Sequence, residues 1–483
     1  MADVRGLGRV RAPRAANPMT WGRWRRGSLG RAVAVVGLVL LFAVACDTWP
    51  SSRGGPELSG FNSSERSIDP TNVTSLLEDF TSTNLSGVVG SPVVSDGVVY
   101  ATTSNPDQLV AFDANGVANC SGSPKRCAAL WRAPLPRWVA DPIVSGGLVY
   151  SVTGGGLFAF AGGTGSGCAT EGVQHTKVCS PRWQSTASTN LGTPTIAGGV
   201  LYVADLSATP ALQAFDAAGT TNCGGTPRTC SPLWTVPGSW GVTSPTVANG
   251  YVYATPHKTG AVTAFDAAGI KNCSGSPKTC SPLWSTVSHV GPNGTGAIGS
   301  PVVGGYIVQY REDSSLAVYD AHGTTNCSGT PALCQPLWTA ATGPQQAASM
   351  VAVAYGNIYV PAYQHIDVFD LGGTTNCAGT PKVCTPLRSV TSPAMGGGIA
   401  VASSVTIANG VGYIGVKNLN SSGGRLIAFD AQDTASCAGQ PLTCPILWSQ
   451  DFSGAPDSTP AVADGRIYIG TLDGLLHAYH LPS

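Results

Sequence analysis

Cysteines are the residues of this 483-residue chain whose type and spacing most directly imply chemistry, and there are fifteen of them. Fourteen fall into close pairs, six spaced C-x6-C and one C-x10-C: Cys120/Cys127, Cys168/Cys179, Cys223/Cys230, Cys273/Cys280, Cys327/Cys334, Cys377/Cys384 and Cys437/Cys444. The segments between them are rich in Gly, Ser, Thr and Pro, so a turn can bring each pair within disulfide reach. Zinc sites prefer closer spacings and gather four ligands. We therefore expect seven disulfides and no metal site, each disulfide clamping its own hairpin without tying distant parts of the fold together.

The fifteenth cysteine, Cys46, follows an export signal. An arginine-rich stretch precedes the uncharged run 32–45, which is too short for an ordinary membrane span but has the length of a signal-peptide core. The run ends Ala43-Val44-Ala45-Cys46, which resembles the lipobox of bacterial lipoproteins. That resemblance implies a lipidated Cys46 at the mature N-terminus. The alternative is an ordinary signal peptide with a free Cys46, and Met19 is an alternative start.

The signal divides the chain into three parts. Residues 1–45 are expected to be the signal peptide, 46–74 the lipidated cysteine with a flexible tether, and 75–483 the folded domain. We expect the mature protein at the outer face of the bacterial cytoplasmic membrane as a lipoprotein, or secreted. Disulfides persist in such a compartment.

Composition excludes several classes of protein. Charged residues are only 11%, and 62 Gly with 35 Pro make the chain too rich in turns for a helical bundle. A hydrophobic content of 43% is too high for disorder. After position 45, 18 basic and 25 acidic residues remain, a net charge of −7. This acidic balance argues against nucleic-acid binding.

No set of residues with catalytic spacing is visible, so no catalytic residue is assigned. The seven His are scattered, and no G-x-S-x-G, H-E-x-x-H or P-loop motif occurs. An Asp does recur after an aromatic residue, at Asp113, Asp216, Asp266, Asp320, Asp370 and Asp430. One Asp per repeat is typical of a turn residue that bonds the backbone two residues further on.

These residues belong to a sequence repeat that occurs eight times, at intervals of 49–56 residues. Each unit opens on small or acidic residues, at Ser91, Asp141, Thr193, Ser244, Ser300, Ser349, Ser403 and Thr459. An apolar strand usually holding Tyr follows, then a strand ending in an aromatic residue and Asp, the cysteine pair, and finally a Trp. Such a unit of four short strands at a period near 50 is typical of a β-propeller blade.

The count predicts how the ring closes. There are eight three-strand units but only seven segments with a cysteine pair and a fourth strand, while 76–81 is an unassigned strand candidate. We therefore expect an all-β, eight-bladed propeller of four-stranded antiparallel blades, closed by an N-terminal strand that completes the last blade.

The motifs Ser-Pro-x-Val, Gly-x-x-Tyr and Leu-x-Ala-Phe-Asp-Ala followed by Leu-Trp resemble the pyrroloquinoline-quinone (PQQ) repeat. That unit builds quinoprotein alcohol dehydrogenases and also non-enzymatic propeller lipoproteins, and the likeness covers about 75–483. In the enzymes, the resemblance implies a quinone in the central channel, between a Trp and a disulfide of adjacent cysteines, above a Ca²⁺ held by Glu and Asn or Asp. This chain has no adjacent cysteines and almost no Glu in the blades. No cofactor is therefore expected, and PQQ with Ca²⁺ is the alternative.

A partner is expected on the face that carries the loops between second and third strands and the connections between blades. The candidate residues there are Arg137, Trp138, Asp141, Trp240, His257, His289, Arg311, His365 and Lys417. Trp138 and Trp240 break the repeat and lie in connections that contain Gly or Pro, so they are the better candidates among these residues for an exposed aromatic contact. The alternative is that each of them covers the core of the neighbouring blade.

The sequence therefore predicts an exported, membrane-anchored and non-enzymatic propeller, expected to be monomeric, that binds a protein or cell-envelope component and no nucleic acid. The alternatives are a quinone-dependent dehydrogenase and a carbohydrate-binding propeller.

Overall fold

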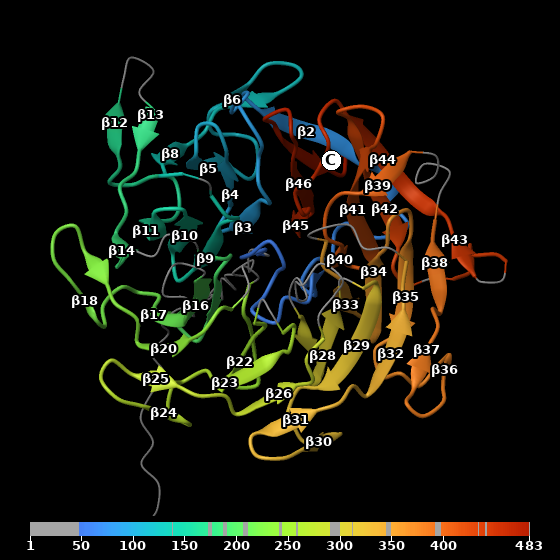
Figure 1. The fold of residues 1–483 in the computed structure, drawn as a ribbon. Helices are drawn as coiled ribbons and strands as arrows, with labels where there is room; N and C mark the ends of the chain where they lie inside the picture. Colours follow the sequence, from blue (N-terminus) through green and yellow to red (C-terminus); the bar gives the residue numbers. More distant parts are fainter. Residues whose placement is uncertain are drawn as a thin grey trace, which may run out of the picture. The chain divides into compact units, whose positions relative to one another are not determined.

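The computed structural model describes residues 48–482 except 138, 172–175, 187–190, 206–210, 241–243, 257–258, 290–299, 312, 344–348, 392–397, 433 and 440–441. Its sheets form the eight blades of a β-propeller (Figure 1). Fold class and blade count are therefore as the repeat predicts. In the described part of the chain, the single helix is the 3-10 turn η1 (Val73–Ser75), and no helix is long and apolar enough to cross a membrane.

Each blade has four strands that run antiparallel from the axis outward. The innermost strands of blades 1–8 are β3 (Val93–Ser95), β9 (Ile143–Ser145), β15 (Thr195–Ala197), β21 (Thr246–Ala248), β27 (Val302–Val303), β33 (Ala352–Ala354), β40 (Thr406–Ala408) and β45 (Ala461–Ala463). The second strands are β4 (Val98–Thr103), β10 (Leu148–Thr153), β16 (Val200–Asp205), β22 (Tyr251–Ala254), β28 (Tyr306–Tyr310), β34 (Asn357–Pro361), β41 (Val411–Asn418) and β46 (Arg466–Gly470).

The third strands are β5 (Gln108–Asp113), β11 (Gly156–Ala161), β17 (Ala211–Asp216), β23 (Thr263–Asp266), β29 (Ser315–Asp320), β35 (Ile366–Asp370), β42 (Gly424–Asp430) and β47 (Leu476–His480). The outer strands are β8 (Trp131–Pro134), β14 (Trp183–Ser185), β20 (Trp234–Pro237), β26 (Trp284–Thr286), β32 (Trp338–Ala341), β38 (Arg388–Val390), β44 (Ile446–Phe452) and β2 (Leu77–Ser82). In blade 7, β39 (Ile399–Val401) also pairs with β41.

All seven predicted disulfides are present. Their hairpins do more than close on themselves, because each one pairs in parallel with the outer strand of the preceding blade. The hairpin strands are β6 (Cys120–Ser121), β7 (Arg126–Cys127), β12 (Ala169–Glu171), β13 (Thr176–Val178), β18 (Cys223–Gly224), β19 (Thr229–Cys230), β24 (Cys273–Ser274), β25 (Thr279–Cys280), β30 (Cys327–Ser328), β31 (Ala332–Cys334), β36 (Cys377–Ala378), β37 (Val383–Cys384) and β43 (Thr443–Cys444). These disulfide-closed hairpins, which we call clipped hairpins, therefore pair with the outer strands of seven of the eight blades in the described structure.

The second cysteine of each pair is buried, which corrects the expectation of disulfides that clamp only their own hairpins. Cys179, the second cysteine of the C-x10-C pair, is 5% exposed and packs with Trp131 in the core between blades 1 and 2. Its backbone N–H donates to the carbonyl of Arg132 on β8 at 2.9 Å, because β13 runs beside that outer strand. The six other buried members are Cys127, Cys230, Cys280, Cys334, Cys384 and Cys444. Each disulfide thus fixes a hairpin to the core of the preceding blade.

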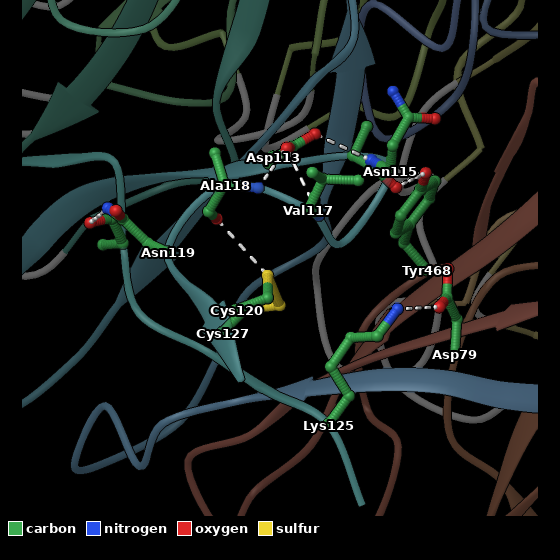
Figure 2. The surroundings of a disulfide bond; sticks show 12 residues. Asp79, Asp113, Asn115, Val117, Ala118, Asn119, Cys120, Lys125, Cys127 and Tyr468 are labelled. Atoms are coloured by element: carbon green, nitrogen blue, oxygen red, sulfur yellow. Dashed lines mark hydrogen bonds and ion pairs between the residues drawn. A yellow bond between two sulfur atoms is a disulfide. The ribbon is translucent and has the colours of Figure 1, made fainter. Parts of the chain in front are cut away.

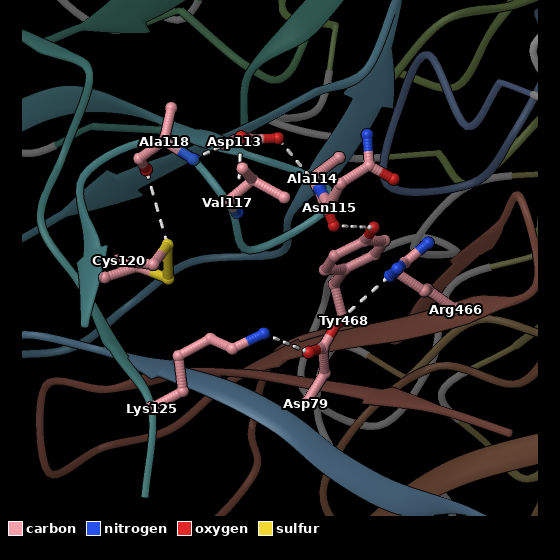
Figure 3. A network of polar contacts seen from close by, with 11 residues as sticks. Asp79, Asp113, Ala114, Asn115, Val117, Ala118, Cys120, Lys125, Arg466 and Tyr468 are labelled. Carbon is pink, nitrogen blue, oxygen red and sulfur yellow. Dashed lines mark hydrogen bonds and ion pairs between the residues drawn. A yellow bond between two sulfur atoms is a disulfide. The ribbon is translucent and has the colours of Figure 1, made fainter. Parts of the chain in front are cut away.

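The N-terminal strand closes the ring as the sequence predicts. β2 pairs antiparallel with β47 and becomes the outer strand of blade 8, and β7 of blade 1 pairs with its other edge. The carboxylate of Asp79 on β2 accepts from Lys125 at 2.9 Å and from Arg466 at 3.2 Å (Figure 3). Burial alone would raise the pKa of Asp79, but these two cations lower it.

In five blades the recurring Tyr of the second strand donates its hydroxyl to a carbonyl of the next blade. The hydroxyl of Tyr468 in blade 8 donates to the carbonyl of Ala114 in blade 1 at 2.8 Å (Figure 3). Tyr468 lies in the same hydrophobic cluster as Cys127 of the first disulfide (Figure 2). Tyr150 and Tyr253 make the same bond to Ala217 and Ala321 of the following blades. These tyrosines are buried, so each hydroxyl needs this partner.

The recurring Asp is a turn residue, as predicted. The carboxylate of Asp216 accepts from the backbone N–H of Ala218, two residues on, and also from those of Thr220 and Thr221. Burial alone would raise the pKa of Asp216, but these bonds and the Thr220 hydroxyl lower it to about 2. The pKa values of Asp320 and Asp370 are lowered in the same way.

These aspartates should make the protein sensitive to acid. In the unfolded chain the carboxyl of Asp216 binds a proton near its ordinary pKa of 3.8, while in the folded chain it does so only near 2. Its stabilising effect is therefore complete above about pH 4 and is lost as the pH falls towards 2. We expect urea midpoints to fall across that window. Asp216→Asn should flatten the slope, whereas Asn115→Ala, which changes an exposed and non-titrating side chain after another third strand, should not.

The centre of the ring is occupied by the chain itself (Figure 1, blue). Six inner strands donate an N–H to the carbonyls of this segment: Val94 to Trp49, Val144 to Pro50, Val247 to Pro56, Val302 to Glu57, Val353 to Ser59 and Ile407 to Gly60, at 2.8–3.0 Å. β1 (Phe61–Asn62) pairs in parallel with β40, and the Asn62 side chain donates to Val462 of blade 8. Residues 49–62, which we call the axial belt, thus contact successive blades in chain order.

The prediction of a flexible tether is therefore wrong for residues 48–74. Trp49 and Leu58 are buried among the blades, and beyond the belt Ile68 and Val73 pack between blades 7 and 8. Since an inner strand is a sheet edge with free N–H groups, the belt satisfies donors that a propeller otherwise leaves to water.

Candidate binding site at the axial mouth

A cavity of about 410 Å³ opens at one end of the channel. Its wall comes from the connections that enter the innermost strands, and its floor is Ser52 and Arg53 of the axial belt. Hydroxyl-bearing residues dominate this wall: Ser91, Thr193, Ser244, Ser403, Ser404, Ser458 and Thr459. These are the openings of the repeat, so the small polar residue at each opening places a ring of donors and acceptors around the axis.

The floor carries a buried cation. Arg53 is only 3% exposed and donates to the carbonyls of Val405, at 2.8 Å, and Val351, in blades 7 and 6. Its Nε has no partner, and no carboxylate lies within ion-pair distance among the described residues. Burial lowers the pKa of Arg53 to about 9, so the guanidinium is still charged at neutral pH. The belt thus holds a positive charge at the base of the mouth.

Two carboxyl groups reach the same cavity. Asp141 accepts from the Ser91 N–H at 2.8 Å and is also bonded by Ser52. Burial nevertheless raises the pKa of Asp141, against those hydrogen bonds. Burial also raises the pKa of Asp457, although Lys417 acts to lower it. No histidine and no cysteine lines the cavity in the described part of the chain. The mouth can therefore bind a polar group.

The two loop sets lie on one face, as expected. In four blades an isolated bridge joins the connection from the preceding blade to the region at the end of the second strand, for example Val89 with Thr103 and Val139 with Thr153. Of the predicted binding residues, Asp141 lines the mouth, and Lys417 borders a smaller cavity of about 160 Å³ on blade 7. Arg137 is exposed on this face.

Two predicted histidines on this face are held by carboxylates. The His289 ring lies 2.6 Å from Asp313, and His365 lies 3.2 Å from Asp367. The bond to Asp367 raises the pKa of His365 against the effect of burial. Neither histidine lines the axial cavity. Trp138 and His257 lie outside the described residues.

Two predictions for this face are wrong. Trp240 is buried, stacks edge-on against Phe265 at 5.1 Å, and donates its indole N–H to Val236. It fills the core between blades 3 and 4 and makes no exposed contact. Arg311 is also buried and donates to Gln309 and the Tyr319 hydroxyl. Arg53 and the hydroxyl ring were not assigned as site residues, although the repeated polar openings were visible in the sequence.

The residues at the axis do not fit a quinone. All seven disulfides lie on hairpins at the outer edges of blades, and the belt fills the channel. Among the described residues no three His, Cys, Asp or Glu side chains gather to hold a metal.

No protein-family model and no curated protein matches the sequence. Solved structures match the fold. A europium-containing methanol dehydrogenase superposes with a TM-score of 0.53 at 11% identity, covering 90% of this chain and 98% of that one. Quinohemoprotein alcohol dehydrogenase ADHIIG from Pseudomonas putida HK5 gives 0.52 at 14%, covering 90% and 80%. BamB from Moraxella catarrhalis gives 0.52 at 13%, covering 84% and 99%. At these identities the likeness establishes a shared propeller fold.

Proposed function

We propose that the protein is an exported, lipid-anchored and non-enzymatic propeller that binds a protein of the cell envelope at its axial mouth. One observation carries this proposal. The channel, where a dehydrogenase of this fold would hold its quinone, is filled by the protein's own residues 49–62. A shared fold does not choose between the two roles, since dehydrogenases and BamB both have it.

The compartment supports the proposal. Seven disulfides indicate an oxidising, extracytoplasmic environment. The lipobox-like Ala43-Val44-Ala45-Cys46 supplies an anchor directly before the belt. Because only Asp47 and Thr48 separate Cys46 from Trp49, a lipid would lie within roughly 10 Å of the channel.

The belt also sets which face an anchor would hold. Trp49 pairs antiparallel with Val94, so the chain enters the channel from the end where the first and second strands turn. β1 runs back to that same end, where Glu65 accepts from the turn residue Gly465. A lipid on Cys46 would therefore hold that end against the membrane and leave the axial mouth facing away from it.

A photo-crosslinking residue tests the binding role on intact cells. Placed at Val88, which is exposed at the mouth, it should give a discrete adduct with an envelope protein. The matched control is Val117, which is more exposed and lies after the third strand, at the opposite end. Equal labelling from both positions, or none from Val88, would contradict the proposal.

Calorimetry tests the rival role. We expect no heat of binding when PQQ and Ca²⁺ are titrated into the purified, oxidised protein. Micromolar or tighter binding would instead support a dehydrogenase and would require the belt to leave the channel.

A further inference from the structure

The outer edge of blade 7 differs from the other seven. In every other blade the outer strand is paired in parallel with the disulfide-clipped segment of the following blade. Blade 8 contributes no such segment in the described part of the chain, and the sheet of blade 7 ends at β44. Ser449, Gln450 and Asp451 of this strand are exposed. In blade 7, the outer strand β44 therefore has an unpaired edge. In the other seven blades, a disulfide-closed segment pairs with the same edge.

The occupied positions show which groups a segment would meet. The N–H one residue after the first residue of the outer strand donates to the clipped segment: Gln184 to Arg228, Thr235 to Lys278, Thr339 to Lys382 and Ser389 to Leu442. The N–H three residues after it donates to the second cysteine, as in Thr186 to Cys230, Val287 to Cys334 and Thr391 to Cys444. Trp448 pairs with Ala428 as Trp183 pairs with Ala159. By this register the N–H groups of Ser449 and Asp451 face outward without an acceptor.

The tryptophan at this position is also uncovered. Trp131, Trp183, Trp234, Trp284 and Trp338 are 0–4% exposed. A glycine of the next blade covers each ring so closely that a Cβ at Gly219 or Gly373 would lie 2.2–2.3 Å from the indole. Trp183 and Trp338 also donate their indole N–H to the same loop. Trp448 is only half-buried, and its N–H has no acceptor among the described residues.

The segment that passes nearby does not fill the position. Ile68, Val73 and Leu76 pack against Tyr413, and η1 lies against β44. They form no strand pairing with β44. The buried Tyr413 hydroxyl lacks the carbonyl acceptor that its counterparts in five other blades have. Two sets of polar groups in blade 7 therefore lack the partners that a covering loop supplies in other blades: the buried Tyr413 hydroxyl and the outward N–H groups of β44. The apolar side chains of the nearby segment fill only the space between blades 7 and 8.

We propose that the β44 edge of blade 7 docks an extended segment of a protein partner, which pairs in parallel with β44 as the clipped hairpins do elsewhere. The segment would place a glycine over Trp448 and offer two backbone carbonyls to Ser449 and Asp451. This inference rests on the proposed function, because it assigns a second contact to the same protein partner.

The test uses a segment of this protein as the probe. An oxidised synthetic peptide of residues 320–337, which covers Trp284 and β26 in the native fold, should bind the purified full chain, as measured by anisotropy of a labelled peptide. Ser449→Pro removes one outward N–H and should weaken binding roughly tenfold. The matched control, Gln450→Ala, lies on the same strand, leaves both outward N–H groups in place and should bind normally.

A change in the peptide keeps the test independent of folding. Replacing the glycine at its position 323 by valine should also weaken binding roughly tenfold, because the side chain would meet the Trp448 ring. The docking site would be overturned if the native peptide did not bind the wild-type protein. It would also be overturned if the Ser449→Pro protein bound the native peptide, and the wild-type protein bound the valine peptide, as tightly as the unaltered pair. Those results would leave the Val88 adduct intact, so failure here and failure of the proposed function are distinguishable.

Discussion

Replacing Trp49 by alanine is expected to lower the free energy of unfolding by about 3–5 kcal/mol, the usual cost of deleting a fully buried Trp. Its ring is completely buried against blades 1 and 8, and its backbone exchanges two hydrogen bonds of 2.9 Å with Val94. The measurement is urea denaturation of the oxidised protein followed by circular dichroism.

The control for Trp49 lies in the same segment. The side chain of Glu57 is exposed, and its backbone carbonyl accepts a hydrogen bond from the N–H of Val302, which alanine would keep. Glu57→Ala should therefore change stability by less than about 0.5 kcal/mol. If both variants were as stable as the wild type, residues 48–62 would be a tether after all, and the channel would be free for a ligand.

Reduction of the disulfides is expected to have the other large effect. Six of the disulfides join cysteines 7 positions apart, and Cys168–Cys179 joins cysteines 11 apart. Closing such a short loop is worth roughly 2–3 kcal/mol in the chain-entropy model. Because each clipped hairpin is also the edge of the preceding blade, its loss should loosen the contact between two blades. The double variant Cys223→Ser with Cys230→Ser should lose about 2–3 kcal/mol. Full reduction should lower the urea midpoint much further.

Hydrogen exchange distinguishes a local from an interblade effect. In that double variant, the N–H groups of Gln184 and Thr186 lose their partners at Arg228 and Cys230 and should exchange faster. The equivalent N–H groups of Ser389 and Thr391, which bond Leu442 and Cys444 on the opposite side of the ring, are the control. Unchanged exchange at Gln184 would mean that the disulfide stabilises its own hairpin alone.

Much of the architecture follows from the sequence alone, because a propeller is built from local repeats. The recurring Tyr, the aromatic residue with Asp, and the cysteine pair fix four strands per unit. Eight inner units with seven outer ones require a strand from elsewhere, and β2 is that strand. The seven disulfides could be paired by spacing, since each joins residues seven or eleven positions apart. Asp216 and its equivalents could be assigned to turns for the same reason.

What the sequence could not show depends on contacts between distant parts. Residues 48–62 have the Gly, Ser and Pro content of a linker, and their order arises from N–H groups that line up only once eight blades surround an axis. Trp240 and Arg311 sit in irregular loops, and only the neighbouring blades decide that they are buried. Cys179 could be paired by spacing, but its burial depends on the blade before its own.

Seven cysteine pairs for eight units show from the sequence that one disulfide-closed hairpin is missing. The sequence does not show that the open edge is β44 of blade 7, because each hairpin covers the blade before its own. Local periodicity determined the blades, since each strand and turn is specified by residues close in the chain. Which outer strand each hairpin pairs with, and which outer strand is left unpaired, is decided only when the blades pack side by side in the closed ring.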